Sequence, residues 1–105
     1  MTVWTDLASV ARGRTLFESP EAKCTSCHSG ARFTNNLTLN VGLGGMFQVP
    51  SLIGVSWRAP YLHDGRAPQL VDRFNPKIGG GDEHGQTSQL TASQIDDLVS
   101  YLETL

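Results

Sequence analysis

The stretch AKCTSCHSG, residues 22–30, constrains this chain more than any other feature. It contains both cysteines of the 105-residue sequence, Cys24 and Cys27, and His28 directly follows the second. Two thiols at this spacing beside an imidazole serve three kinds of site: a dithiol–disulfide redox pair, half of a zinc site, or an anchor for covalently attached haem. The rest of the sequence bears on the choice between these three.

A redox dithiol is expected after a strand in a β–α–β pattern, whereas this motif follows a short helix pattern and leads into a loop. A structural zinc ion needs four ligands, and Cys24, Cys27, His63 and His84 could supply them on paper. The two histidines, however, are separated by 20 intervening residues, unlike the tight ligand pairs of zinc modules. C-x-x-C-H is the signature of c-type haem attachment: two thioethers anchor the porphyrin, and His28 supplies the proximal nitrogen to iron.

Helix signals lie at the two ends of the chain. Apolar residues recur at near-helical spacing over 6–17, with Thr5 or Asp6 as the N-cap. Residues 91–102 carry one apolar face after a capping box formed by Thr91 and Gln94.

The middle of the chain is rich in loops. A short third helix is predicted over 68–74, stopped by Asn75 and Pro76. Glycine-rich tracts over 29–50 and 75–89 contain interspersed apolar residues, so they need something to wrap around. Strand signals are weak, with one short alternating piece over 37–41.

This layout resembles a cytochrome c domain. In that family the first helix carries a glycine and, four residues on, an aromatic, and these are similar to Gly13 and Phe17. The last helix carries an aliphatic and, three residues on, an aromatic, similar to Leu98 and Tyr101. The resemblance implies one all-α domain over 1–105, with crossing terminal helices and loops wrapped around one covalently attached haem c.

A narrower resemblance covers 49–67, most specifically the run PYLHDG at 60–65, together with the closing helix over 90–102. These segments resemble the C-terminal haem domain of bacterial di-haem cytochrome c peroxidases. This chain has one C-x-x-C-H, so the resemblance implies the electron-transfer half rather than the peroxide-reacting half.

Several side chains are candidates for the distal iron ligand. His84 is favoured because it lies in the loop before the terminal helix, where this family places its distal ligand. Met46 is the runner-up, and Lys77 would first have to lose its proton. His63, in the PYLHDG turn, is expected to be structural. An open distal site is the remaining alternative.

The tract with Trp57, Arg58, Tyr61 and Arg66 could hold the haem propionates, since arginine binds carboxylates in a bidentate manner. We expect Trp57 or Arg58 to make this contact. The alternative is a core tryptophan with solvated arginines.

The net charge of −2 gives no basic surface for a nucleic-acid partner, and no apolar run reaches the roughly 20 residues of a membrane span. No signal peptide is visible. Haem attachment to cysteines takes place outside the bacterial cytoplasm, so we expect a periplasmic or otherwise exported protein. The chain is then a mature form or an excised domain, with Met1 added for expression.

The leading hypothesis is a one-electron transfer protein or module without enzymatic turnover, serving a redox partner protein or a fused domain. The alternative is a peroxidase-like haem enzyme with an open or labile distal site, in which His63 or His84 acts as the acid–base group. A ligand sensor, with a mobile loop at Gly79–Gly81, is a third hypothesis without specific support.

Overall fold

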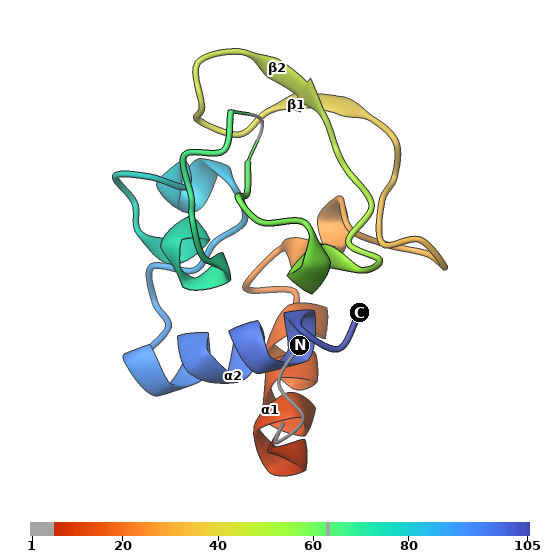
Figure 1. Ribbon diagram of the computed structural model, residues 1–105, viewed down its shortest axis with the longest axis vertical. Coiled ribbons are helices and arrows are strands. Elements are labelled where there is room, and N and C mark those ends of the chain that lie inside the picture. Colours follow the sequence, from red (N-terminus) through yellow and green to blue (C-terminus); the bar gives the residue numbers. More distant parts are fainter. Residues whose placement is uncertain (1–5, 63) are drawn as a thin grey trace.

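Two α-helices near the ends of the chain form the base of the molecule. The structure is a computed structural model and describes residues 6–62 and 64–105. Helices α1 (Leu7–Glu18) and α2 (Ala92–Leu102) cross one another (Figure 1).

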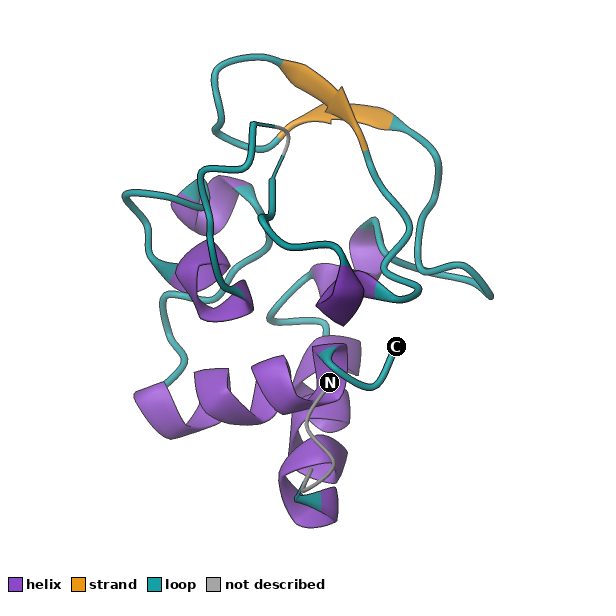
Figure 2. Cartoon of the chain, viewed as in Figure 1, coloured by secondary structure: helices purple, strands orange, loops and turns teal. Residues whose placement is uncertain are grey.

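Between these helices the chain runs through loops, one β-hairpin and short 3₁₀ helices (Figure 2). In chain order, the 3₁₀ helices of the described residues are η1 (Cys24–Ser26), η2 (Val55–Trp57), η3 (Leu70–Phe74) and η4 (Gly81–Glu83). In Figure 1, η1 and η2 (orange and green) lie on one side and η3 and η4 (blue-green) on the other. The hairpin lies across the end opposite the crossed helices.

Helix α1 begins where the sequence predicts. The carboxylate of Asp6 accepts hydrogen bonds from the backbone N–H groups of Ala8 at 2.9 Å and Ser9 at 3.3 Å, so Asp6 is the N-cap. The predicted helix over 6–17 is confirmed, and it ends one residue later than expected, before Ser19 and Pro20. Thr5, the other cap candidate, lies outside the described residues.

Helix α2 is confirmed together with its capping box. Thr91 Oγ1 accepts from the Gln94 backbone N–H at 3.2 Å, and Gln94 Oε1 accepts from the Thr91 backbone N–H at 2.9 Å. The third predicted helix is present as the shorter 3₁₀ helix η3, where Asp72 Oδ2 accepts from the Gln69 backbone N–H at 2.9 Å.

The crossing of α1 and α2 forms the centre of the core. Gly13 lies against the backbone carbonyl of Asp97, and a Cβ atom at this position would overlap that carbonyl group. Phe17 packs against Tyr101 with ring centroids 5.4 Å apart, and Leu98 is fully buried. The predicted core role of Gly13, Phe17, Leu98 and Tyr101 is therefore confirmed.

The expectation of an all-α fold is wrong in one element. Strands β1 (Thr38–Asn40) and β2 (Met46–Gln48) pair antiparallel, with Leu39 opposite Phe47. The alternating piece predicted over 37–41 is β1, and its partner gave no comparable signal. A strand this short depends on its partner rather than on its own propensity, because a two-stranded ribbon is marginal in isolation.

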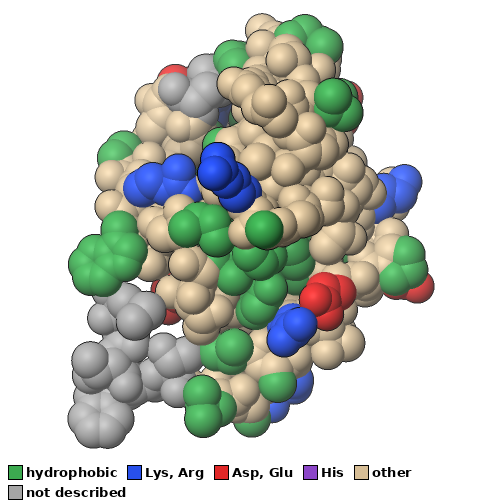
Figure 3. Space-filling model, turned by 90° about the vertical axis from the view of Figure 1, so that its right-hand side faces the viewer, with side chains coloured by type: hydrophobic (Ala, Val, Ile, Leu, Met, Phe, Trp, Pro, Cys, Tyr) green, Lys and Arg blue, Asp and Glu red, His purple; other side chains and the backbone are tan. Residues whose placement is uncertain are grey.

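Many apolar side chains are only partly buried. The buried core cluster comprises Phe17, Val55, Leu98, Tyr101 and Leu102. Around it pack partly exposed apolar residues: Val10, Leu16, Cys24, Phe33, Leu52, Tyr61, Leu70, Phe74, Leu90 and Leu105. On the face shown in Figure 3, apolar side chains gather across the middle, with Lys, Arg, Asp and Glu side chains around them. A small domain with so few fully buried side chains gains stability from any apolar group that covers more of this surface.

Within the described residues, no helix has the length and apolar character needed to cross a membrane.

Candidate functional site

The C-x-x-C-H motif folds into a tight turn on η1. The backbone N–H groups of Cys27 and His28 both reach the carbonyl of Cys24, at 3.3 Å and 2.9 Å. Lys23, directly before the turn, has a left-handed backbone with φ of 60°. The turn therefore brings the two thiols and the imidazole onto one short piece of chain.

His28 is oriented by its own loop. Its Nδ1 lies 2.9 Å from the carbonyl oxygen of Phe33. A neutral imidazole that donates from Nδ1 carries its lone pair on Nε2, so Nε2 is the nitrogen able to bind a metal. Burial lowers the pKa of His28 below its ordinary value, against the opposing effect of the carbonyls of Phe33 and Pro50.

His84 repeats this arrangement in a second loop. It directly follows η4, is half-buried, and its Nδ1 lies 3.1 Å from the carbonyl oxygen of Gly79. Burial and the nearby charge of Arg73 lower the pKa of His84 to about 4. A ring held neutral, with Nδ1 donating, again presents the Nε2 lone pair as a ligand.

The two histidines lie in loops from different parts of the chain. Burial is the main cause of the lowered pKa of His84, followed by the charge of Arg73, and His28 makes the smallest contribution. Figure 1 places η1, which precedes His28, and η4, which precedes His84, on opposite sides of the molecule. Each imidazole, held neutral with Nδ1 donating, would offer its Nε2 lone pair to a metal.

Arg73 is a half-buried cation beside His84. Its Nη2 donates to the backbone carbonyl of His84, and its guanidinium lies 4.9 Å from the ring centroid of Phe74. Its Nη1 is buried and has no hydrogen-bond partner among the described residues. Burial lowers the pKa of Arg73 to about 10, which leaves the side chain charged at neutral pH.

The side chains of the site fit a covalently attached haem. Cys24 and Cys27 are free thiols rather than a disulfide. Burial raises the pKa of the Cys24 thiol, although the charge of Arg73 partly opposes this. The orphaned Arg73 Nη1 and the partly exposed apolar side chains around the core show that this region has unmet polar and apolar contacts.

The competing explanations of the cysteine motif gain no support. The motif follows helix α1, whereas a redox dithiol is expected after a strand of a β–α–β unit. Within residues 6–62 and 64–105, no group of three or more His, Cys, Asp and Glu side chains is arranged to hold a metal ion. His63, one of the four candidate zinc ligands, lies outside the described residues.

The other candidates for the distal position lie elsewhere. Met46 is 62% exposed on β2, on the face of the hairpin opposite Phe47. Lys77 is exposed. The interpretation of His84 as a surface residue bonded to Asp82 or Glu83 does not hold, because its ring is bonded to the Gly79 carbonyl.

The predicted propionate residues lie at the surface. Trp57 is 75% exposed at the end of η2, and Arg58 Nη2 donates to the carbonyl of Ser51 at 2.5 Å. Arg66 pairs with Asp64, with 2.7 Å between Nη2 and Oδ2. Contact of Trp57 or Arg58 with a propionate stays a prediction.

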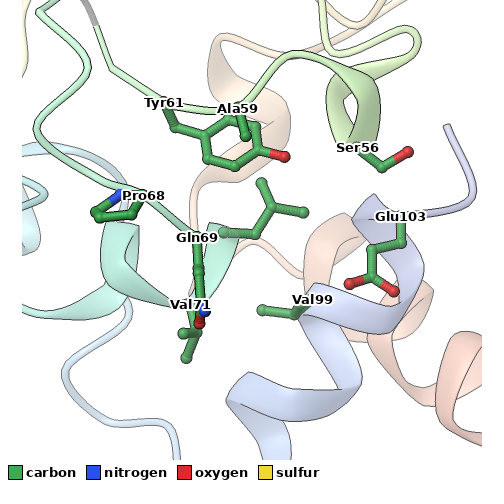
Figure 4. Close-up of a pocket in the computed structure, with 9 residues that line it drawn as sticks. Ser56, Ala59, Tyr61, Pro68, Gln69, Val71, Val99 and Glu103 are labelled. Atoms are coloured by element: carbon green, nitrogen blue, oxygen red, sulfur yellow. The ribbon is translucent and has the colours of Figure 1, made fainter. Parts of the chain in front are cut away.

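A separate hollow lies beside α2. A cavity of about 450 Å³ opens between η3, the segment around Tyr61, and α2 (Figure 4). Figure 4 shows Tyr61 and Ala59 on one side and Val99 and Glu103 of α2 on the other. Its lining includes none of the cysteines or described histidines, and Tyr61 packs against the core there.

The sequence analysis missed Arg73. It lies in the predicted third helix, and no role was predicted for its charge. The available signal was an arginine next to Phe74 in the short helix LVDRF, immediately before the loop that carries His84. Its burial results from tertiary packing, which no local pattern shows.

Comparison with known proteins gives consistent matches. The sequence model of the family described as Cytochrome c matches residues 10–105. Hydrazine synthase subunit gamma of Kuenenia stuttgartiensis is 35% identical over 72 residues, covering 69% of this chain and 20% of that subunit. The methylamine utilization protein MauG of Methylorubrum extorquens is 29% identical over 123 residues, covering 93% of this chain and 35% of MauG.

Solved structures agree. A structure of Kuenenia stuttgartiensis hydrazine synthase pressurized with xenon matches with a TM-score of 0.86 and 26% identity, covering 92% of this chain and 46% of that one. A MauG-like protein associated with microbial copper homeostasis matches with a TM-score of 0.77 over the same shares, and at 22% identity it supports the fold alone. The chain spans less than half the length of each of these relatives.

Proposed function

Because the chain belongs to the cytochrome c family, we propose that it is a single-haem c-type cytochrome that transfers one electron at a time, as a protein or as a module of a larger one. The family match confirms the resemblance drawn from the C-x-x-C-H motif and the helix contacts. The MauG and hydrazine synthase matches confirm the narrower resemblance to the di-haem peroxidase group. Membership implies covalently bound haem c, which supplies one-electron redox chemistry when bound.

In this proposal Cys24 and Cys27 form the two thioethers, and one C-x-x-C-H motif means one haem. Nε2 of His28 is the proximal ligand, and Nε2 of His84 is the distal one. The observation that carries the assignment is the matched geometry of the two rings. Each Nδ1 lies within hydrogen-bond distance of a backbone carbonyl, at 2.9 Å for His28 and 3.1 Å for His84. Such second contacts fix the tautomer and the ring orientation of a ligating histidine.

The same arrangement favours electron transfer over turnover. A distal histidine held in place leaves no open position for a substrate. Paired imidazoles also give a lower reduction potential than a histidine–methionine pair. Met46 would have to leave the exposed face of β2 to ligate, which supports His84 as the ligand. We propose that electrons pass through the partly exposed thioether edge at Cys24 and Cys27.

The proposal is tested by identifying the distal ligand of the matured protein from its spectrum. We expect a six-coordinate, low-spin spectrum that carbon monoxide and hydrogen peroxide change only slowly. His84→Ala should open the site, producing a high-spin fraction and rapid carbon monoxide binding. Met46→Leu is the matched control and should leave the spectrum unchanged.

Two results would overturn the assignment. One is a near-infrared methionine-to-iron band in the parent protein that disappears in Met46→Leu. The other is a His84→Ala variant whose spectrum and carbon monoxide kinetics equal those of the parent.

A haem enzyme is the second candidate, because the named relatives include a synthase subunit and a protein of methylamine utilization. It requires a labile distal site with an acid–base group above it. Rapid reaction of the untreated protein with hydrogen peroxide would favour this function over electron transfer.

The partner in either case is another redox protein or a fused haem domain. We propose that the chain works in the periplasm or another exported location, where haem is attached to cysteines. The limited share of each relative that this chain spans is consistent with its being one part of a larger redox protein.

A further inference from the structure

We propose that Arg73 is a positioning residue for the distal histidine, and that its half-buried charge raises the reduction potential of the haem. This inference rests on the proposed function, in which His84 is the distal ligand. Arg73 has no part in the C-x-x-C-H motif, and its role follows from its contacts and its charge.

Three contacts close a loop around the His84 ring. Arg73 Nη2 donates to the His84 carbonyl, and His84 Nδ1 lies 3.1 Å from the Gly79 carbonyl oxygen. Gly79 in turn packs directly on the carbonyl of Arg73, where a Cβ atom would overlap that group. The Gly79 backbone N–H also donates to the carbonyl of Asn75 at 2.9 Å. These contacts hold both the backbone and the ring of His84 against the C-terminal end of η3.

The far side of the same loop is fixed by Asp82. Its Oδ1 accepts from the backbone N–H groups of Thr87 and Ser88, both at 3.1 Å, and its Oδ2 accepts from Ser88 Oγ at 2.6 Å. Asp82 is also within electrostatic range of Arg73. The hydrogen bonds of Asp82 restrain one side of the loop that carries His84. The contact of Arg73 with the His84 carbonyl restrains the other side, so it limits movement of the ring away from its position.

The charge of Arg73 has a separate effect. Its guanidinium donates to the backbone carbonyl of His84, so the charge lies beside the proposed distal ligand, and the same charge acts on Cys24 and His28. A buried positive charge disfavours the ferric state more than the ferrous state, because the ferric state carries one more positive charge. With Nη1 lacking a hydrogen-bond partner among the described residues, this charge is only partly compensated by the protein.

The experiment compares four variants of the matured haem protein. Arg73→Gln removes the charge and the forked donor, Arg73→Lys keeps the charge but loses the fork, and His84→Ala removes the ligand. Arg14→Gln is the matched control, since Arg14 is exposed on α1 and pairs with Glu18 at 3.3 Å. The readouts are the midpoint potential and the rate of carbon monoxide binding to the ferrous protein, which release of His84 limits.

We expect Arg73→Gln to lower the midpoint potential and to speed carbon monoxide binding by about tenfold, as for loss of a charged hydrogen bond. Arg73→Lys should keep a potential close to that of the parent but still bind carbon monoxide faster. Arg14→Gln should change neither readout.

Parent-like values for Arg73→Gln would overturn the inference, provided that His84→Ala opens the site. If His84→Ala has no effect, the distal assignment itself fails and the inference fails with it. Should Arg73→Gln not accumulate as a haem protein, Arg73→Lys decides, because an unchanged rate of carbon monoxide binding contradicts the positioning role.

Discussion

Gly13 of α1 lies directly against the backbone carbonyl of Asp97 in α2, at the point where the two helices cross. No side chain fits between the two backbones, so this approach depends on the absence of a Cβ atom. The crossing holds α1, which leads into the cysteine turn, against α2, which follows the loop with His84. The site is therefore assembled from two segments that this contact holds together.

Gly13→Ala should lower the free energy of unfolding by about 1–3 kcal/mol, because the added methyl group forces the helices apart. This is opposite to the usual effect in a helix, where alanine is favoured over glycine by about 1 kcal/mol. Urea unfolding of the haem protein measures the difference. Ala11→Ser, at an exposed position of the same helix, is the control and should cost far less. A Gly13→Ala protein as stable as the parent would contradict the packing described here.

Asp97 should make stability depend on pH. Hydrogen bonds from Arg12 and Ser9 lower the pKa of Asp97 below its ordinary value. Its folded-state pKa is thus below the unfolded value of about 3.9, so the carboxylate stabilises the fold above about pH 4. This contribution is lost as the pH falls through the folded-state pKa.

Denaturant midpoints measured from neutral to acidic pH test this directly. Asp97→Asn should be less stable than the parent at neutral pH, and the gap should close in acid. Asp96→Asn, at the exposed neighbouring position, should show no such convergence. A gap that stays constant with pH would show that the charge of Asp97 is not responsible.

The capping box of α2 should contribute measurably to the free energy of unfolding. Thr91→Ala removes the acceptor for the Gln94 backbone N–H and should cost about 1 kcal/mol. Ser93→Ala, in the exposed first turn of the same helix, is the control. Equal loss in both variants would assign the effect to helix propensity rather than to the cap.

The helix pair was predictable because its signals are local. Asp6 and Thr91 mark the starts of α1 and α2 through caps that operate within a few residues. The C-x-x-C-H motif is likewise recognised from five consecutive residues, 24–28. These features do not depend on distant parts of the chain.

The remaining features depend on tertiary contacts. Strand β2 is defined by pairing with β1, and no alternation in its own residues predicts it. Arginine side chains are usually exposed, and Arg73 is covered only because η3 packs against the loop that carries His84. Trp57 shows the converse, since a large aromatic side chain that suggested a binding role is mostly exposed.

His84→Met should raise the midpoint potential of the haem, because a methionine ligand gives a higher potential than a second imidazole. A near-infrared methionine-to-iron band should appear at the same time. Lys77→Met places a methionine at an exposed position in the same loop and should produce neither change. An unchanged potential and no new band in His84→Met would exclude position 84 from the coordination sphere.

In the proposed function, Cys24 and Cys27 hold the haem covalently and His28 binds its iron. The most direct measurement is mass spectrometry of the matured protein after extraction with acidified organic solvent, combined with a pyridine haemochrome spectrum. We predict that the haem stays with the polypeptide at one per chain, with a c-type spectrum, and that Cys24→Ala and Cys27→Ala each remove one attachment. Release of the haem into the solvent, or a colourless matured protein, would contradict the account.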